Sequence, residues 1–261
     1  GFTRRGHLAE ISLDLRRDGG RFTADSAVRF SEACARCDED PIWVVWLRSV
    51  GRDFCLGTDG GREQWPRLPG TDFVAALAAV RQPIVASVRG RAEAEGFELA
   101  LAADLRVVER GSRFAMTQVA HGRLPGFGGT QRLPRAIGME RALRVLLLGE
   151  SIPGRRAADW GLAARLASRA DEGARRLADD LLERGPIALR FAKEAVRRSL
   201  DFALDDGARF EHDLYVQELP PEQWHDCLVT ACHGDAELDQ QVRYLLQVHR
   251  EAGSFLEAPA P

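Results

Sequence analysis

The segment Val88-Arg-Gly-Arg-Ala-Glu-Ala-Glu-Gly-Phe-Glu-Leu-Ala-Leu-Ala-Ala-Asp-Leu-Arg-Val107 decides the fold and points to the function. It has the pattern of a strand end, a turn at Gly90, and a helix that begins near Glu95 and Gly96. The first N–H groups of a helix lack partners within the helix, and the helix dipole adds partial positive charge there. Such an end stabilises an oxygen that becomes negative during a reaction. Glu98 follows within the first turn, so this segment predicts an oxyanion-binding end beside a candidate acid/base.

A second glycine-rich loop follows another predicted strand. Arg52-Asp-Phe-Cys-Leu-Gly-Thr-Asp-Gly-Gly61 comes after the apolar run at residues 42–47, which is short, β-branched and aromatic like a buried strand. Gly57, Gly60 and Gly61 allow the backbone to approach a ligand closely. We therefore expect the two loops to point one N–H group each at the same carbonyl oxygen.

Four segments together resemble the crotonase superfamily, also called the enoyl-CoA hydratase/isomerase family. Residues 54–59 are similar to its Phe-x-Ala-Gly-x-Asp loop, and residues 90–104 to its Gly-rich helix with Glu-Leu-Ala. The other two are Leu124-Pro-Gly-Phe-Gly-Gly-Thr-Gln-Arg-Leu-Pro-Arg-Ala-Ile-Gly138 and Leu148-Gly-Glu-Ser-Ile-Pro-Gly-Arg-Arg-Ala-Ala-Asp-Trp-Gly-Leu162. One glycine-rich string recurs by chance, whereas four in the family's order are specific.

The resemblance implies an α/β fold built as a spiral of ββα units, with a C-terminal helical region that makes trimers, which in some cases stack into hexamers. It also implies an acyl-CoA thioester substrate, with coenzyme A as part of the substrate and no separate cofactor or metal. The N–H groups of Thr58 and Glu95 are expected to form the oxyanion hole, and Glu98 to act as acid/base. The expected substrate-binding residues are Gly57, Asp59, Gly60 and Gly96.

The chain departs from the family pattern at the second catalytic carboxylate. Hydratases of the family carry a Pro-Glu pair where this chain has Thr117 and Gln118. An amide cannot take up or release a proton as a carboxylate does, although Gln118 could still orient a water molecule or a carbonyl group. The altered pair leaves hydration, isomerisation, C–C cleavage and decarboxylation open.

Two further residues are unusual for the family. Glu95 replaces the middle glycine of the glycine triple, and its side chain either points to solvent at the helix start or supplies the missing second carboxylate. His121 stands where related sequences carry an aliphatic residue. It is either a structural residue or a general base, because histidine titrates near neutral pH.

The remaining pattern predicts an α/β front and a helical back. Strands are expected at residues 8–15, 42–47, 83–88 and 105–109, alternating with helices at 24–37 and 72–80, as in a layered α/β core. Further helices are expected at 139–148, 172–184, 187–200 and 205–219. We expect an acyl-CoA-binding core at residues 1–200 and a helical region at 201–261.

Composition excludes several classes of function. The net charge of −3 provides no basic field for nucleic acid, and no run reaches membrane-spanning length. Five cysteines, an odd number, favour a reducing compartment, so a cytoplasmic location is expected. Cys34 and Cys37 have the spacing of a redox or zinc pair, but no second close pair accompanies them, which favours buried thiols.

Three functional hypotheses follow from these observations. The first is a catalytic acyl-CoA enzyme with an altered acid/base pair. The second is a non-catalytic acyl-CoA-binding member, favoured by Gln118 and by residues 231–240, which do not resemble the family's CoA-contacting tail. The third is an oligomeric scaffold without CoA affinity, which would not need an open loop at Gly57, Gly60 and Gly61.

Overall fold

The computed structural model describes residues 1–38, 41–59 and 70–218. Gly60 and the tail segment 231–240 lie outside these residues. The chain divides into two compact units, Gly1–Glu194 and Ala195–Pro261. The division predicted at residue 200 stays a prediction.

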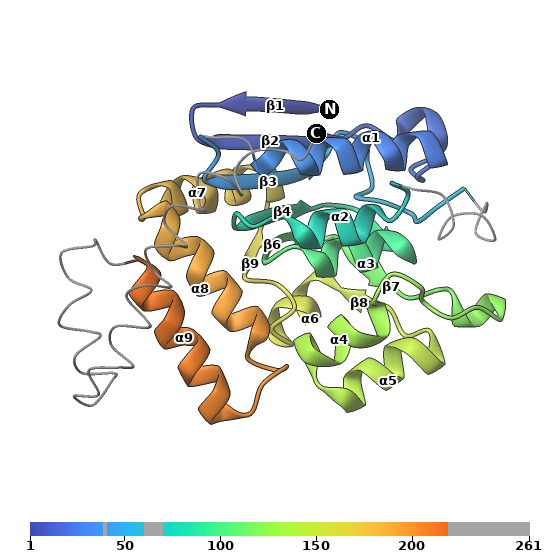
Figure 1. The fold of residues 1–261 in the computed structure, drawn as a ribbon. Coiled ribbons are helices and arrows are strands. Elements are labelled where there is room, and N and C mark those ends of the chain that lie inside the picture. The colour runs from blue at the N-terminus through green and yellow to red at the C-terminus, as the bar shows by residue number, and fades with distance from the viewer. Residues whose placement is uncertain (39–40, 60–69, 219–261) are drawn as a thin grey trace, which may run out of the picture. The chain divides into compact units, whose positions relative to one another are not determined.

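The first unit contains a large, mainly parallel sheet (Figure 1). Its strands, in order across the sheet, are β1 (Phe2–Arg5), β2 (Leu8–Leu13), β3 (Val44–Ser49), β4 (Ile84–Val88), β6 (Leu105–Glu109) and β9 (Arg165–Ala167). Only the pairing of β1 with β2 is antiparallel among these strands. Because β3 and β4 are parallel neighbours, the loops that follow them leave the same edge of the sheet.

A second, smaller sheet has three short strands. It consists of β5 (Arg91–Glu93), β7 (Arg113–Ala115) and β8 (Ile152–Pro153). The pairing of β5 with β7 is parallel, and the pairing of β7 with β8 is antiparallel. Each of β4 and β6 is followed by a short strand of this second sheet and then by a helix. Cys55, after β3, bridges to Ala92 of β5, so the unit that begins at β3 also reaches this sheet.

Nine α-helices are described: α1 (Ala24–Ala35), α2 (Phe73–Ala79), α3 (Glu95–Ala102), α4 (Gly129–Ile137), α5 (Met139–Leu148), α6 (Gly154–Asp159), α7 (Ala170–Leu182), α8 (Pro186–Arg198) and α9 (Leu204–Glu218). Local chemistry explains several starts. Thr23 and Ser26 form a reciprocal capping box before α1, and Asp72 accepts a hydrogen bond from Ala75 N before α2. The predicted helices are observed with ends shifted by at most two residues.

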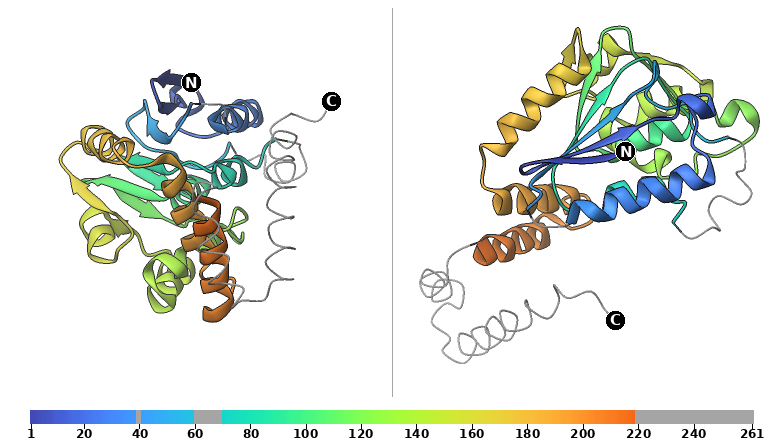
Figure 2. Two further views of the ribbon diagram at one scale, coloured as in Figure 1. Left: turned by 60° about the vertical axis from the view of Figure 1, so that its left-hand side comes forward. Right: turned by 90° about the horizontal axis from the view of Figure 1, so that it is seen from above.

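Strand alternation places apolar side chains on both faces of the large sheet. Val45 and Leu47 pack into the main core with residues of α1, α2 and α3. Val44 and Trp46 pack on the opposite face, against Ala174 and Ala178 of α7. The sheet is therefore covered on both faces, as expected for parallel strands (Figure 2).

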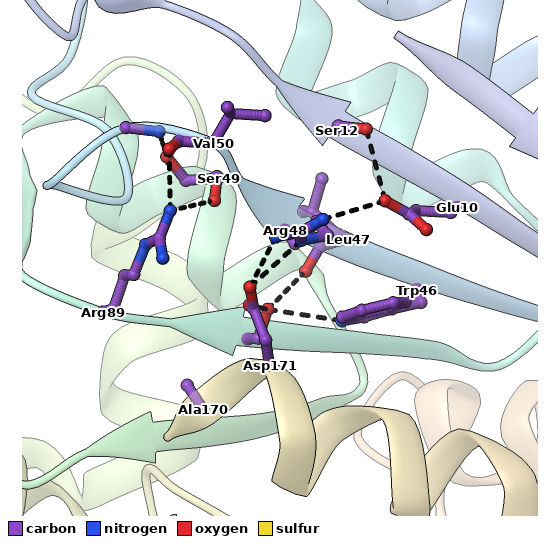
Figure 3. Close-up of polar contacts among 12 residues, drawn as sticks. Glu10, Ser12, Trp46, Leu47, Arg48, Ser49, Val50, Arg89, Ala170 and Asp171 are labelled. Atoms are coloured by element: carbon purple, nitrogen blue, oxygen red, sulfur yellow. Dashed lines mark hydrogen bonds and ion pairs between the residues drawn. The ribbon is translucent and has the colours of Figure 1, made fainter. Parts of the chain in front are cut away.

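A polar network attaches α7 to the sheet (Figure 3). Arg48 of β3 donates to Asp171 in the first turn of α7 at 2.7 Å and to Glu10 of β2 at 3.2 Å. The other Asp171 oxygen accepts a hydrogen bond from Ser87 at 2.6 Å. Nearby, Arg89 donates to the carbonyl oxygens of Ser49 and Val50, both at 2.8 Å. These bonds hold the end of β3, from which the Gly57 loop leaves.

Candidate active site

The two glycine-rich loops meet at the carboxyl edge of the large sheet. Phe54 N and Cys55 N donate to the carbonyl oxygen of Arg91, and Glu93 N donates to the carbonyl oxygen of Cys55 at 2.9 Å. Arg91 also forms an ion pair with Asp53 at 2.9 Å. The loop after β3 is thus hydrogen-bonded along its length to the strand that leads into α3.

Two glycines permit this close approach. A Cβ at Gly96 would collide with the carbonyl oxygen of Cys55 and lie 2.6 Å from its carbonyl carbon. A Cβ at Gly57, where φ is +97°, would lie 2.5 Å from a carboxylate oxygen of Glu95. A side chain at position 96 would force the loop and the helix start apart, whereas one at position 57 would strain the backbone and displace the Glu95 carboxylate.

The helix start itself has a strained backbone. Ala94, the residue before α3, has φ +50° and ψ −124°, a conformation that residues with a Cβ rarely adopt. This conformation turns the chain from β5 into α3, and the Ala94 carbonyl oxygen accepts bonds from Phe97 N and Glu98 N. Strain of this kind is concentrated at functional sites, where the surrounding structure enforces it.

Thr58 and Glu95, the predicted oxyanion-hole residues, lie together. The Thr58 N–H donates to Oε2 of Glu95 at 3.2 Å. The Glu95 N–H has no hydrogen-bond partner within the described residues. The Glu95 side chain is buried, with 4% of the residue exposed, so the hypothesis that it points to solvent is wrong. Its aliphatic stem brings the carboxylate back onto the neighbouring loop instead.

Glu98 is fully buried, and N–H donors from two segments contact its carboxylate. Oε1 accepts from Phe127 N and Gly129 N, both at 2.8 Å, and Oε2 accepts from Gln118 Nε2 at 3.0 Å. Gly129 is the first residue of α4, so the carboxylate lies at a helix N-terminus. Three donors from two segments, together with the start of α4, therefore fix the position of this carboxylate.

Gln118 has one satisfied and one unsatisfied amide atom. Its Nε2 is bonded to Glu98, whereas its buried Oε1 has no hydrogen-bond partner within the described residues. A buried acceptor without a partner costs stability unless a water or ligand donates to it. The side chain is thus oriented by Glu98 and retains one acceptor.

A cavity of about 280 Å³ opens beside the Thr58–Glu95 pair. Arg21, His121 and Arg123 line it together with Thr58, Asp59, Ala94, Glu95 and Thr117. Arg21 donates to the carbonyl oxygens of Leu56 at 2.5 Å and Thr58 at 3.4 Å, and so supports the loop. The side chains of His121 and Arg123 are exposed and form no hydrogen bond or ion pair with another described residue.

The cysteines of the described residues are buried thiols. Burial raises the pKa of Cys55 to about 12 and also raises the pKa of Cys34. Both thiols therefore stay protonated near neutral pH, which makes them poor nucleophiles. No group of three or more His, Cys, Asp or Glu side chains within the described ranges could hold a metal ion.

The arrangement combines a proton-transfer group with N–H donors. Glu95 and Glu98 are three residues apart on α3, a spacing that puts side chains on the same side of a helix. The Glu98 carboxylate can exchange a proton, and the backbone N–H groups of Thr58 and Glu95 can stabilise a developing oxyanion.

Comparison with known proteins identifies the family. Residues 3–225 match the sequence pattern of the Enoyl-CoA hydratase/isomerase family. The chain belongs to this family. It is similar to 2,3-dehydroadipyl-CoA hydratase of Escherichia coli (strain K12), with 36% identity covering 83% of this chain and 89% of that protein. The human protein named "Enoyl-CoA hydratase domain-containing protein 2, mitochondrial" is 35% identical, over 72% of this chain and 70% of that protein.

The predicted fold is confirmed by solved structures. A crystal structure of an enoyl-CoA hydratase subunit from Geobacillus kaustophilus HTA426 superposes with a TM-score of 0.78. The alignment covers 83% of this chain and 88% of that one, at 31% identity. The successive units described above, each a strand of the large sheet, a contact with the small sheet and a helix, correspond to the spiral of ββα units. No described helix is long and apolar enough to cross a lipid bilayer.

Sequence reasoning anticipated most residues gathered here and missed others. Thr58, Gly57, Glu95, Gly96, Glu98 and Gln118 lie in one region, and Asp59 and His121 line its cavity. Arg21, Phe127 and Gly129 were not expected. The Leu124–Gly138 motif signalled the last two only through the resemblance, because nothing in it identifies which N–H groups face Glu98.

Proposed function

We propose that this protein is a lyase that adds water to, or removes it from, the Cα–Cβ bond of an acyl-CoA thioester. The observation that carries the proposal is the buried Glu98 carboxylate, one helical turn from Glu95. The Glu95 N–H has no partner among the residues that the structure describes, and the Glu95 side chain contacts the Thr58 loop. The names of the relatives support hydration over the other reactions of the family, since they include 2,3-dehydroadipyl-CoA hydratase and carnitinyl-CoA dehydratase.

Glu98 can serve both proton transfers in this proposal. In the hydration direction, Glu98 accepts a proton from water as the water oxygen bonds to Cβ. The electron pair of the double bond moves onto the thioester oxygen, where the N–H groups of Thr58 and Glu95 stabilise the enolate. Glu98 then returns the proton to Cα, the carbonyl group reforms, and one water molecule has been added.

Gln118 takes a positioning role in this scheme. Its Nε2 contacts the Glu98 carboxylate at 3.0 Å, and its unsatisfied Oε1 can accept a hydrogen bond from the water or from the product hydroxyl group. The amide can thus orient the water molecule, but it cannot take a proton from it as a second carboxylate would. We therefore expect slower hydration than with two carboxylates.

The test is hydration of crotonyl-CoA by wild type, Glu98→Gln and Gln118→Glu. Glu98→Gln should lower kcat by about 10²–10⁴ and change the Kd for acyl-CoA little, because the shape is kept while proton transfer is lost. In Glu98→Gln, the Gln118 amide can rotate so that its oxygen accepts a hydrogen bond from the amide at position 98. The variant should therefore still fold. Gln118→Glu should raise kcat about tenfold or more. Unchanged turnover in Glu98→Gln would contradict the proposal.

A second candidate is a non-catalytic acyl-CoA-binding protein. It is favoured by Gln118 in the place of a carboxylate and by the Glu95 carboxylate on the Thr58 N–H. Tight binding of acyl-CoA, measured by calorimetry, without turnover of any enoyl-CoA in wild type or Gln118→Glu would favour this candidate.

We further propose a trimer or hexamer, as the family resemblance implies. Met139, Leu143 and Leu147 form a stripe of exposed apolar side chains on α5, with exposed fractions of 66%, 41% and 64%. Contiguous apolar surface of this kind marks interfaces. Sedimentation at micromolar concentration tests the assembly, and a monomeric mass would contradict it.

The proposed reaction needs only the acyl-CoA substrate and water, with no separate cofactor. A cytoplasmic location is part of this proposal and is not more than that, because the human relative is named as mitochondrial. Reduced, buried thiols at Cys34, Cys37 and Cys55 fit a reducing compartment of either kind.

A further inference from the structure

The Glu95 carboxylate occupies the N–H group that a thioester oxygen would need. Thr58 N–H donates to Glu95 Oε2 at 3.2 Å, and the same oxygen lies 2.5 Å from the position of a Cβ at Gly57. The carboxylate therefore lies against the loop backbone, directly at the donor. One N–H group makes one good hydrogen bond, so a thioester oxygen and this carboxylate compete for it.

The same cavity offers the carboxylate another place. Arg123 and His121 line the cavity with Glu95, and neither side chain has a hydrogen-bond or ion-pair partner within the described residues. Arg21 is less suited, because it already donates to the carbonyl oxygens of Leu56 and Thr58. A guanidinium group binds a carboxylate with two parallel hydrogen bonds, so Arg123 can receive the displaced group.

We propose that Glu95 is an internal ligand of the oxyanion site, which acyl-CoA displaces toward Arg123 and His121. Residue 95 then determines how tightly acyl-CoA binds, in addition to contributing its backbone N–H. The inference rests on the proposed acyl-CoA function. It assigns to the side chain a role distinct from that of a second acid/base, which was the other hypothesis for Glu95.

The two roles predict opposite kinetics. Displacement precedes both the substrate complex and the transition state, so it weakens both equally and raises KM without changing kcat. Loss of an acid/base group lowers kcat instead. A KM-against-kcat comparison therefore separates an internal ligand from a proton-transfer group.

The experiment compares wild type, Glu95→Ala and Glu95→Gln by steady-state kinetics with crotonyl-CoA. Glu95→Ala should lower KM roughly tenfold or more, because a charge-assisted hydrogen bond no longer competes, and kcat should stay within about twofold. Glu95→Gln keeps the shape of the side chain and should lower KM less, since a neutral amide oxygen is a weaker acceptor. Glu93→Gln is the matched control two residues earlier. Glu93 does not line the cavity and pairs with Arg91, so both constants should be unchanged.

A double-mutant cycle tests the receiving site. Arg123→Gln should raise KM in wild type and have little effect in Glu95→Ala, because no carboxylate then needs a partner. An unchanged KM in both Glu95 variants, with wild-type turnover intact, would overturn this inference and leave the proposed function standing. A large fall in kcat would overturn it in favour of the acid/base role. Absence of acyl-CoA binding in calorimetry, in wild type and Glu95→Ala alike, would overturn the proposed function itself.

Discussion

Glu95 and Glu98 lie one turn apart at the start of the same helix, yet their surroundings differ in kind. Glu98 faces α4 and accepts hydrogen bonds from Phe127 N, Gly129 N and Gln118 Nε2. Glu95 faces the loop after β3 and, among the described residues, accepts one hydrogen bond, from Thr58 N. Both are buried, but only Glu95 lines a cavity with cationic side chains. Two buried carboxylates on one helix can therefore differ in how many donors hold them.

The largest expected effect comes from separating the start of α3, which carries both carboxylates, from the loop after β3. Gly96→Ala places a Cβ against the Cys55 carbonyl group, which must move the Thr58 loop away from α3. We expect a loss of about 1–3 kcal/mol of stability from overpacking. Loss of one oxyanion donor should also lower kcat by about 10²–10³.

Urea unfolding and crotonyl-CoA kinetics measure the two effects of Gly96→Ala. Gly111→Ala is the matched control, because its Cβ would meet no atom within 4 Å, and it should change stability by less than about 0.5 kcal/mol. Equal behaviour of the two variants would contradict the close approach of loop and helix.

The comparison is sharpened by truncating each carboxylate in turn. Glu98→Ala leaves buried N–H donors without an acceptor, at a cost of about 3 kcal/mol or more. Glu95→Ala uncovers Thr58 N–H toward a cavity where water can accept its bond, so the cost should be about 1 kcal/mol or less. Urea unfolding of both variants at neutral pH is the measurement. Equal losses would mean that Glu95 is held as firmly as Glu98.

The smallest effect concerns the ion pair of Asp53 and Arg91, which joins the loop after β3 to the strand before α3. Hydrogen bonds from Arg91 lower the pKa of Asp53 below its ordinary value. A lowered folded-state pKa gives stability that is present above the unfolded pKa of about 3.9 and is lost as pH falls below it. Because half of the Arg91 side chain is exposed, we expect less than about 1 kcal/mol.

Urea unfolding of wild type and Asp53→Asn between pH 7 and pH 3 tests this prediction. The stability difference should be largest at pH 7 and shrink toward pH 3. Asp25→Asn, in an exposed pair with Arg29, is the control and should show a smaller difference throughout. A difference that grows on acidification would contradict the assignment.

The sequence predicted the parts of the site that depend on local pattern. The start of α3 at Glu95, the Gly57 loop and the place of Glu98 in the first turn follow from strand, turn and helix signals. The short strands β5 and β7 were not predicted, since three residues are too few to show a period-two alternation.

The direction of the Glu95 side chain could not be predicted either. It depends on a rotamer choice and on how closely the Thr58 loop approaches α3, both of which come from packing between segments far apart in sequence. The same holds for Phe127 and Gly129, whose N–H groups reach Glu98 only because α4 packs beside α3. Local propensity contains no information on such contacts.

The chain has one lysine, Lys193, and its position has a practical consequence. Its ammonium group, on α8, donates to the carbonyl oxygens of Val80 and Gln82 at 2.7 Å and pairs with Asp104 at 2.8 Å, with 8% of the side chain exposed. Amine-acylating reagents need a free, uncharged and accessible amine. The two hydrogen bonds and the ion pair keep the Lys193 amine charged and inaccessible. The rate of single-site acylation therefore reports how often α8 opens locally from the turn between α2 and β4. Lys193 is thus a built-in chemical probe of that local opening.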